Sequence, residues 1–341
     1  MVKGKMKRCK YYISILLDSS FKKLFEVINI VHKRSGKNRI YLFFDIVICS
    51  IRYLAGYTDY MVFWFETLSH KQRKTFITRG VSNEYIKKLN NSKYYDNFDN
   101  KIKFNNVFKN YINREFVDLS VSSFDEFKTF IDKHKIIIVK PVDGICGKGV
   151  EKINTAQYSN VEDLYNKLKC DKQLLVEECI VQNKALSDLF PNSVNTIRLV
   201  TIRKKHKTVV IFRVIRIGNG NNVVDNYNHG GMFSLVSEDG IVTKPAIDKK
   251  GNIYEYHPVT KTPIVGFKIP YFKESLDMVV KASEVIEEVG YVGWDIAITN
   301  NGPVLIEGNQ LPGYDLYQSK IHLNDDNTGF KPLFDKVIYK D

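Results

Sequence analysis

The sequence predicts an α+β protein in which a mostly helical, basic N-terminal region precedes two subdomains that contain strands. Apolar residues recur every three or four positions in residues 11–31, which is the period of an amphipathic helix. Short apolar runs broken by glycine-rich loops fill residues 136–217, and residues 292–310 have the pattern of two strands around a turn. At 341 residues and 44% hydrophobic content, the chain can bury a core and hold two or three subdomains. The expected boundaries are 1–125, 126–185 and 186–341.

Positive charge is concentrated at the start of the chain. The net charge is +13, and residues 1–100 hold 19 Lys and Arg against 8 Asp and Glu. Such a basic region is explained by a solvated tail, by attraction to an anionic membrane surface or by nucleic-acid binding. Nucleic acid is the least supported partner, because the sequence contains no basic–aromatic repeat and no named nucleic-acid motif. The first two explanations stay open.

The most apolar run, residues 40–65, does not have the pattern of a transmembrane helix. Asp45 and Arg52 lie inside it, and Gly56 to Asp59 interrupts it before a full span is complete. We expect a buried or interfacial helix. Peripheral contact with a membrane is an alternative, because the flanking residues are basic.

Cysteine usage predicts a reduced protein. The five cysteines are an odd number, form no Cys-X-X-Cys pair and have no histidines at zinc-binding spacing. The basic start is not followed by the apolar core and small-residue cleavage site of a secretory signal. We therefore expect a cytoplasmic protein, either free or peripheral at the inner membrane face.

The stretch VGWDIAITNNGPVLIEGNQ, residues 292–310, predicts a metal site. Its two strands alternate, so that Asp295 lies on one face of the first strand. By the same alternation Leu305, Glu307 and Asn309 share a face of the second strand. Folding the hairpin about its Asn-Asn-Gly turn places Asp295 opposite Glu307. Two carboxylates and an amide oxygen suit Mg²⁺, whereas the alternative is a solvated hairpin with polar residues on its wet face.

Residues 136–153, IIIVKPVDGICGKGVEKI, predict a strand, a glycine loop and a second strand. Lys140 ends the first strand, and Lys148 adds a second cation within the loop. Flexible glycines can bring backbone N–H groups close to phosphate oxygens, and those of this loop are Gly144, Gly147 and Gly149. The loop is not a Walker motif, because no Ser or Thr follows the lysine and the next element has a strand pattern. An ordinary hairpin turn explains the glycines equally well.

A strand that ends in an acidic segment, QLLVEECIVQN at residues 173–183, predicts a place for a nucleoside. The backbone of a strand passing into a linker can pair with an adenine edge, and a nearby carboxylate can accept from ribose hydroxyls. The ribose candidates are Glu177, Glu178 and Asp188.

Arginines occur among the apolar residues of the two strands predicted at residues 193–203 and 208–217. A guanidinium group binds anions through two parallel hydrogen bonds. We therefore expect Arg198, Arg213 and Arg216 to face anionic ligands.

The polar loop at residues 218–232 follows these strands, in a position where a loop that covers the substrate would be useful. His229 in this loop is a candidate general base or substrate contact. The simpler explanation is a histidine whose hydrogen bonds are made within the loop. Downstream, residues 274–289 predict an amphipathic helix that leads into the hairpin. Upstream, Ser122-Ser123 before Phe124 predicts a helix cap.

In chain order, these features resemble the ATP-grasp superfamily and, within it, the sugar-transfer-associated branch. The stretches that carry the resemblance are VKPVDGICGKGV, VEECIVQ, SVNTIRLVT, VDNYNHGGM, GWDIAI and PVLIEGN, with DYMVFWFETLSHKQRKTFITRG upstream. They cover about residues 42–320, and their order and spacing are more specific than any one of them. The resemblance implies an ATP-grasp fold, in which two α+β subdomains close on ATP.

The resemblance also implies roles for individual residues. Lys140 and Lys148 become phosphate contacts, and Arg198 becomes a candidate for stabilising phosphate or an acyl-phosphate. The implied adenine hinge consists of Glu177, Glu178, Cys179 and Ile180. The implied Mg²⁺ ligands are Asp295, Glu307 and Asn309.

The chemistry that the resemblance implies is ligation of a carboxylate to an amine with ATP and Mg²⁺. A substrate carboxylate attacks the γ-phosphorus to give an acyl-phosphate and ADP, and an amine then displaces phosphate. The association of this branch with surface-polysaccharide biosynthesis suggests an amino acid or similar amine joined to a saccharide carboxylate. Two alternatives stay open. One is a kinase on the same scaffold, and the other is a non-catalytic adaptor that binds a membrane surface through the basic N-terminal region.

Overall fold

The computed structural model describes residues 21–144, 149–220, 225, 230–315 and 318–340. The chain divides into two compact units, of which the first consists of residues 1–88 and 313–341 and the second of residues 89–312. These boundaries differ from those expected at residues 125 and 185. The C-terminal helix packs within the helical unit, and several short helices that follow residue 89 pack on a sheet of the second unit.

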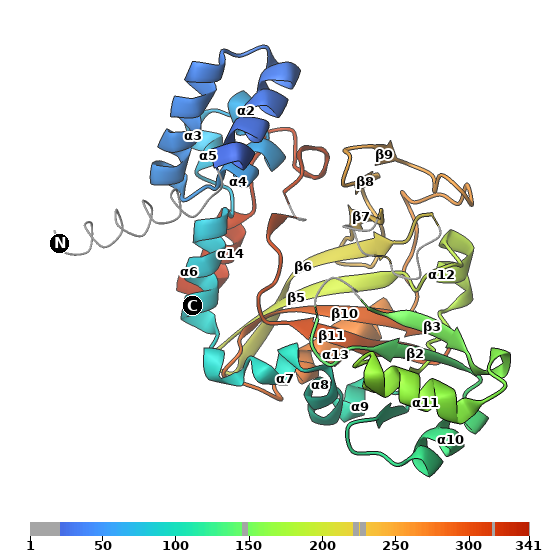
Figure 1. Ribbon diagram of the computed structural model, residues 1–341. Helices are drawn as coiled ribbons and strands as arrows, with labels where there is room; N and C mark the ends of the chain where they lie inside the picture. Colours follow the sequence, from blue (N-terminus) through green and yellow to red (C-terminus); the bar gives the residue numbers. More distant parts are fainter. Residues whose placement is uncertain (1–20, 145–148, 221–224, 226–229, 316–317, 341) are drawn as a thin grey trace. The chain divides into compact units, whose positions relative to one another are not determined.

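The first unit is helical (Figure 1). It opens with a helical hairpin of α2 (Phe21–Ser35) and α3 (Arg39–Tyr53). Asn38 caps α3 by accepting a hydrogen bond from the backbone N–H of Ile40. The apolar run 40–65 is divided between α3 and α4 (Tyr57–Val62), as its interruption indicates. None of the helices within the described residues combines the length and apolar character needed to cross a bilayer.

The remaining helical segments of this unit bring its two stretches of chain together. They are a 3-10 turn at Phe65–Thr67, α5 (His70–Arg73), α6 (Arg79–Leu89), a 3-10 turn at Lys320–His322 and α14 (Lys331–Tyr339). The ring of Phe334 on α14 stacks on Tyr85 of α6 with centroids 5.9 Å apart. The hydroxyl of Tyr85 donates to Asp335 at 2.6 Å. The C-terminal helix therefore belongs to this core.

A buried ion pair explains the charge inside the apolar run. Asp45 on α3 is buried, and the guanidinium of Arg73 donates to its two oxygens at 2.7 and 2.8 Å. The hydroxyl of Tyr60 donates to the same carboxylate at 2.6 Å. Asp45 thus faces the unit's interior with its oxygens satisfied, as a buried charge requires.

The second unit contains a four-stranded antiparallel sheet in the order β1-β4-β2-β3. Its strands are β1 (Phe116–Asp118), β2 (Ile136–Lys140), β3 (Glu151–Asn154) and β4 (Leu175–Glu178). The hydrophobic core of this sheet includes side chains of α10 (Phe124–Lys133) and α11 (Val161–Cys170). The predicted cap is confirmed, because Ser123 accepts from the backbone N–H of Glu126 and the Glu126 side chain accepts in return.

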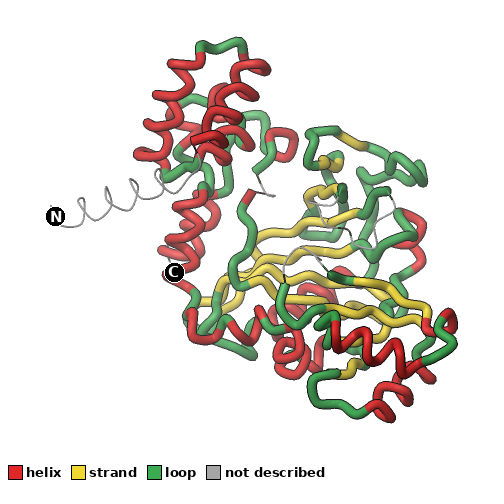
Figure 2. The backbone as a smooth tube through the Cα atoms, in the orientation of Figure 1, coloured by secondary structure: helices red, strands yellow, loops and turns green. Residues whose placement is uncertain are grey.

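A seven-stranded antiparallel sheet forms the larger part of the second unit, in the order β11-β10-β5-β6-β7-β8-β9. Figure 2 shows the strands in yellow. Its strands are β5 (Thr196–Lys204), β6 (Lys207–Ile217), β7 (Met232–Leu235), β8 (Ala246–Asp248), β9 (Ile253–Tyr254), β10 (Tyr291–Thr299) and β11 (Gly302–Asn309). The predicted pairing of the two arginine-bearing strands is confirmed as β5 with β6.

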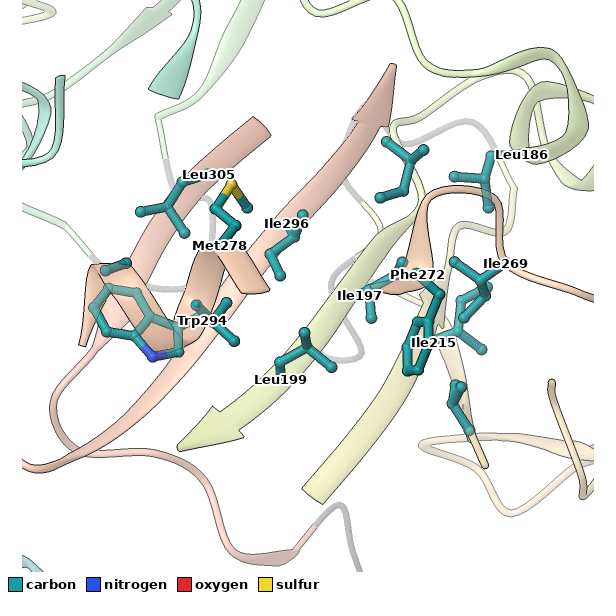
Figure 3. Close-up of a cluster of buried hydrophobic side chains, with 14 of the residues drawn as sticks. Leu186, Ile197, Leu199, Ile215, Ile269, Phe272, Met278, Trp294, Ile296 and Leu305 are labelled. Carbon is teal, nitrogen blue, oxygen red and sulfur yellow. The ribbon is translucent and has the colours of Figure 1, made fainter. Parts of the chain in front are cut away.

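Helices cover one face of the large sheet and build the main hydrophobic core there. They are α7 (Asp96–Asp99), α8 (Lys101–Val107), α9 (Lys109–Ile112) and α13 (Phe272–Ala282). The second unit also contains α12 (Lys184–Leu189) and two 3-10 turns, at Ser92–Tyr94 and Thr155–Gln157. Figure 3 shows Trp294 and Ile296 of β10 beside Met278 of α13. The predicted helix 274–289 is shorter than expected, because α13 ends at Ala282 and turns follow it.

The hairpin of β10 and β11 contains a bulge that the alternating pattern does not reveal. Asp295 is opposite Glu307, but the next pair is Ile296 with Leu305, so Ile306 is an extra residue. Leu305 is consequently fully buried in the core with Ile296. The expectation that Leu305 shares a face with Glu307 was wrong, because the extra residue reverses the alternation between them.

Candidate active site

The face of the large sheet opposite the hydrophobic core carries a group of charged side chains. Asp295 on β10 lies between Glu307 on β11 and Arg198 on β5 in the strand register. Directly opposed residues of antiparallel strands point to the same face. Arg216 joins this face from β6, where it donates to Asp295. The prediction that Asp295 and Glu307 lie opposite each other is confirmed.

Asp295 is the centre of this group. It is 2% exposed and accepts from Nε and Nη2 of Arg198, the latter at 2.6 Å, and from Nη1 of Arg216 at 2.7 Å. Burial alone would raise the pKa of Asp295, but the two guanidinium charges outweigh it and hold the pKa well below its usual range. Asp295 is therefore ionised. A carboxylate has about four lone-pair sites, so three such bonds leave room for one more partner.

Glu307 and Asn309 complete the donor set predicted for a metal. Burial raises the pKa of Glu307 above its usual range, and the neighbouring charge of Asp295 raises it further. Asn309 Nδ2 donates to Glu307 Oε1 at 3.3 Å and to the Gly293 carbonyl at 3.4 Å. Two crowded carboxylates beside an amide oxygen are hard donors that a divalent cation would neutralise. The residues present thus fit Mg²⁺.

Asp225 extends the charged face. Its Oδ1 lies 3.3 Å from Nη2 of Arg216, and its Oδ2 accepts from the backbone N–H of Thr196 at 2.8 Å. Arg216 therefore bridges Asp225 and Asp295. Sequence reasoning singled out Arg216 as an anion contact and saw Asp225 only as part of a polar loop. Their meeting with Asp295 depends on strand pairing, so no local signal could have found it.

Arg213 does not belong to this group. It is opposite Leu199 in the strand register, on the face that carries the hydrophobic core. There Nη2 donates to the Val210 carbonyl at 3.1 Å and lies 3.6 Å from Glu238. Arg213 and Arg216 are an odd number of residues apart on one strand, and so they point to opposite faces. The expectation that Arg213 faces an anionic ligand with Arg198 and Arg216 was wrong.

A second buried network ties the small sheet to this site. Glu177 on β4 accepts from Asn105 at 2.7 Å and from Arg114 at 2.7 and 3.0 Å, and its other oxygen pairs with Lys140. Burial would raise the pKa of Glu177, but Arg114 and Lys140 hold it far below its usual range. Glu177 thus fixes Lys140 in place. Its carboxylate is buried among protein groups, which corrects its assignment as a ribose contact.

The described part of the glycine loop contacts a lysine that sequence reasoning missed. Lys101 on α8 donates to the Gly144 carbonyl at 2.8 Å. Burial lowers the pKa of Lys101, while the charge of Glu307 opposes this shift. Gly149 has φ +76°, and a side chain there would press on Pro141. The other predicted loop contacts, Gly147 and Lys148, lie outside the described residues, as does His229.

A cavity of about 370 Å³ lies beside the predicted hinge. Glu178, Ile180 and Val181 line it from the segment after β4, and the β10–β11 turn at residues 299–304 lines it from the large sheet. The hinge is held to that sheet by Asn183, whose backbone N–H donates to the Ile298 carbonyl at 2.6 Å. The structure thus brings part of the predicted hinge to a cavity beside the β10–β11 hairpin.

Two predicted nucleotide contacts lie away from the lining of this cavity. Asp188 on α12 pairs with Lys184 one turn earlier, at 2.6 Å, and its side chain is exposed. Cys179 is half-buried between Glu178 and Ile180, and burial raises its pKa. Neither residue is among those that line the cavity, so Glu178 is the ribose candidate that the structure places there.

The family described as sugar-transfer associated ATP-grasp matches residues 80–321. This match covers more than half of the chain, and the chain therefore belongs to that family. No curated protein matches the chain in sequence.

Solved structures of ATP-grasp ligases have a distant likeness to the chain. The ligase PsnB, in complex with precursor peptide PsnA2 and AMPPNP, is 14% identical with a TM-score of 0.44, covering 81% of this chain and 71% of its own. D-alanine–D-alanine ligase from Coxiella burnetii is 11% identical with a TM-score of 0.44, and the match covers 73% of this chain and 58% of the ligase. N5-carboxyaminoimidazole ribonucleotide synthetase is 12% identical with a TM-score of 0.41, and the match covers 68% of this chain and 51% of the synthetase.

Membership of this family defines the class of protein. The chain is a sugar-transfer associated ATP-grasp protein. The resemblance described from the sequence, and the α+β fold that it implied, are confirmed.

Proposed function

We propose that this chain joins an amine to a carboxylate through an acyl-phosphate, with an amino acid or similar amine as the nucleophile. The observation that carries the proposal is the arrangement around Asp295, where two guanidinium groups and two further carboxyl groups meet on one sheet face. Phosphoryl transfer needs positioned positive charge more than a nucleophilic side chain. The buried arginines supply that charge in a fixed geometry.

The residues that would hold Mg²⁺ are Asp295, Glu307 and Asn309. When bound, the ion supplies neutralisation of phosphate charge. Asp295 orients Arg198 and Arg216 by accepting from both, which fixes the two guanidinium groups beside the hairpin. Arg198 would stabilise the phosphate being transferred, or the acyl-phosphate, as its position in the family pattern implies.

The lysines are positioned by the second network. Glu177 pairs with Lys140 and thereby keeps its ammonium group at the end of β2, where the glycine loop begins. Lys101 lies at the same loop through the Gly144 carbonyl. We infer that both contact ATP phosphates, and that the cavity beside Glu178 receives the nucleoside. By the family resemblance, Lys148 is a further proposed phosphate contact.

The family's association with sugar transfer supports a saccharide as the source of the carboxylate. We propose a saccharide carboxylate in surface-polysaccharide or related biosynthesis. A lipid-linked saccharide would place the reaction at the inner membrane face, and the basic N-terminal region supports peripheral contact with an anionic membrane there. His229 remains a proposed substrate contact or general base.

Nucleotide binding tests the site first. Titration calorimetry would measure Mg-ATP binding by the wild type, Glu307→Gln and Glu238→Gln, the last being an exposed glutamate away from the charged face. We expect Glu307→Gln to weaken binding by roughly tenfold or more, with Glu238→Gln unchanged. Equal binding by the wild type and Glu307→Gln would remove Glu307 from the site.

Isotope transfer separates a ligase from a kinase. With a carboxylate labelled with ¹⁸O, attack on the γ-phosphorus moves one labelled oxygen into the acyl-phosphate, and displacement by the amine leaves that oxygen in inorganic phosphate. We expect labelled phosphate only when ATP, carboxylate and amine are all present. Formation of a stable phosphate ester from a hydroxyl acceptor, with no release of phosphate, would establish the kinase instead.

A further inference from the structure

The outward face of α3 in the helical unit is apolar. Its exposed side chains are Ile40 (69%), Tyr41 (51%), Phe44 (59%), Ile48 (45%) and Ile51 (60%), called here the α3 stripe. They recur at helical spacing, while the opposite face buries Leu42, Ile46 and Cys49. A helix that is apolar on both faces is normally covered on both. A contiguous exposed patch of this kind marks an interaction site.

A groove of about 430 Å³ adjoins the C-terminal end of this stripe. Ile51 belongs to both, and the charged residues that further line the groove are four cations, Arg52, Arg73, Lys74 and Lys331, and one carboxylate, Glu84. Among the residues that the structure describes, Arg52 and Lys74 have no ion-pair partner, whereas Lys331 pairs with Asp335. The stripe therefore ends at a cationic groove that can receive an anion.

Cations flank the stripe elsewhere as well. Arg39 precedes Ile40 and is exposed, and the ammonium group of Lys37 lies 5.5 Å from the centre of the Tyr41 ring. The helical unit as a whole holds 22 Lys and Arg against 11 Asp and Glu, so it carries eleven of the chain's thirteen net positive charges. An apolar stripe edged by cations is complementary to an anionic lipid surface.

We propose that the helical unit docks on an anionic phospholipid bilayer through α3. The α3 stripe enters the interfacial layer, and Arg52 and Lys74 contact lipid phosphates from the groove. A second copy of this chain is a poorer occupant, because two such faces would bring together surfaces of the same strong positive charge. The combination of apolar burial with several cations is what stable peripheral binding requires.

The apolar part of the proposal is tested with the full chain and a matched pair of variants. Phe44→Ser/Ile48→Ser/Ile51→Ser removes the stripe, and Val121→Ser/Ile253→Ser/Val259→Ser removes three equally exposed apolar side chains from the other unit. Co-sedimentation would use vesicles of phosphatidylcholine with and without phosphatidylglycerol. We expect wild type and control to bind the anionic vesicles, and the stripe variant to bind at least about tenfold more weakly.

The charged part of the proposal is tested with a second pair of variants. Arg52→Gln/Lys74→Gln should weaken binding to anionic vesicles by about fivefold per cation at low salt, and Lys205→Gln/Lys207→Gln, from an exposed turn of the other unit, should not. Mg-ATP binding by every variant checks that the chain is folded. This check is independent of docking, because α3 contributes no residue to the nucleotide site.

Several outcomes would overturn the proposal. Docking through α3 would be excluded if the wild type does not bind anionic vesicles. It would also be excluded if the stripe variant binds them as tightly as the wild type. Calorimetric binding of inorganic phosphate that is lost in Arg52→Gln/Lys74→Gln, without vesicle binding, would make the groove a site for a soluble anion. A wild-type dimer that the stripe variant converts to monomers in sedimentation velocity would assign the stripe to a second copy.

Discussion

Arg114 donates from Nη1 to the carbonyl oxygen of Leu305 at 2.6 Å, directly beside the bulge that sets Glu307 opposite Asp295. The same guanidinium holds Glu177 on the small sheet at 2.7 Å. One buried side chain therefore connects the network that orients Lys140 with the hairpin that carries the proposed metal ligands. A bulge interrupts the ladder and leaves backbone groups in need of a partner, and Arg114 supplies it.

Replacing Arg114 by Met should destabilise the protein more than it changes nucleotide contacts directly. Glu177 would keep Lys140 but lose its second cation, and the Leu305 carbonyl would lose its donor. Breaking a buried ion pair from one side costs about 3 kcal/mol. Urea unfolding of Arg114→Met against wild type measures this loss.

The control for that experiment is Lys109→Met, which removes an exposed cation from the neighbouring helix α9. A surface change of this kind should alter the free energy of unfolding by less than about 0.5 kcal/mol. If the two variants unfold at the same urea concentration, Arg114 does not join the two sheets in the way described.

The site could be predicted from the sequence where local rules determine the geometry. Folding the hairpin symmetrically about Asn301 predicted that Asp295 is opposite Glu307, and this pair is found. The two-residue turn after Thr299 alone would pair Asp295 with Ile306, and the bulge supplies the shift of one residue. The same rule failed for Leu305, because a bulge has no signature in the apolar pattern. The alternation of side chains along a strand was also not applied to Arg213 and Arg216. Because these arginines are three residues apart on one strand, they cannot point to the same face of the sheet.

The remaining members of the site depend on contacts between distant segments. Helix packing brings Lys101 to the site, and a loop brings Asp225. Arg114 reaches the site because it contacts both sheets. Each is an ordinary charged residue in its local sequence. Only the folded chain distinguishes them from solvated surface residues, which is the commoner fate of such side chains.

Cys49 should be inert to thiol reagents in the folded protein. It is fully buried beside Asp45 and Arg73, and burial raises its pKa to about 12 despite the opposing charge of Arg73. At pH 8 only about one thiol in ten thousand would be ionised, and the thiolate is the reactive form. Alkylation followed by mass spectrometry should label exposed Cys170 well before Cys49.

Unfolding the protein in guanidinium provides the comparison for this experiment, since every thiol should then react. Labelling of Cys49 at the rate of Cys170 in native buffer would mean that the core between α3 and α5 opens readily. The prediction is confined to the folded state, because burial is the cause of the shift.

The two carboxylates of the hairpin should respond differently to neutralisation. Asp295→Asn removes the anion that Arg198 and Arg216 both contact, and it should destabilise the fold by about 3 kcal/mol. Glu307→Gln removes a like charge from the neighbourhood of Asp295 and should be tolerated or slightly stabilising. Urea unfolding of both variants without nucleotide distinguishes the roles, and a larger loss for Glu307→Gln would contradict the arrangement.

The stability difference between wild type and Glu307→Gln should depend on pH with a defined sign. Burial and Asp295 raise the pKa of Glu307 in the folded protein above its ordinary value of 4.5. Folding then favours the protonated carboxyl, so its contribution is complete below pH 4.5 and is lost as the pH rises through the folded pKa. Glutamine does not titrate. The variant should therefore gain stability relative to wild type from acid toward neutral pH, as measured by urea unfolding in metal-free buffer, with Glu238→Gln measured in parallel. A difference that shrinks as the pH rises would mean that Glu307 is stabilised as an anion, and that Asp295 is not close enough to oppose its charge.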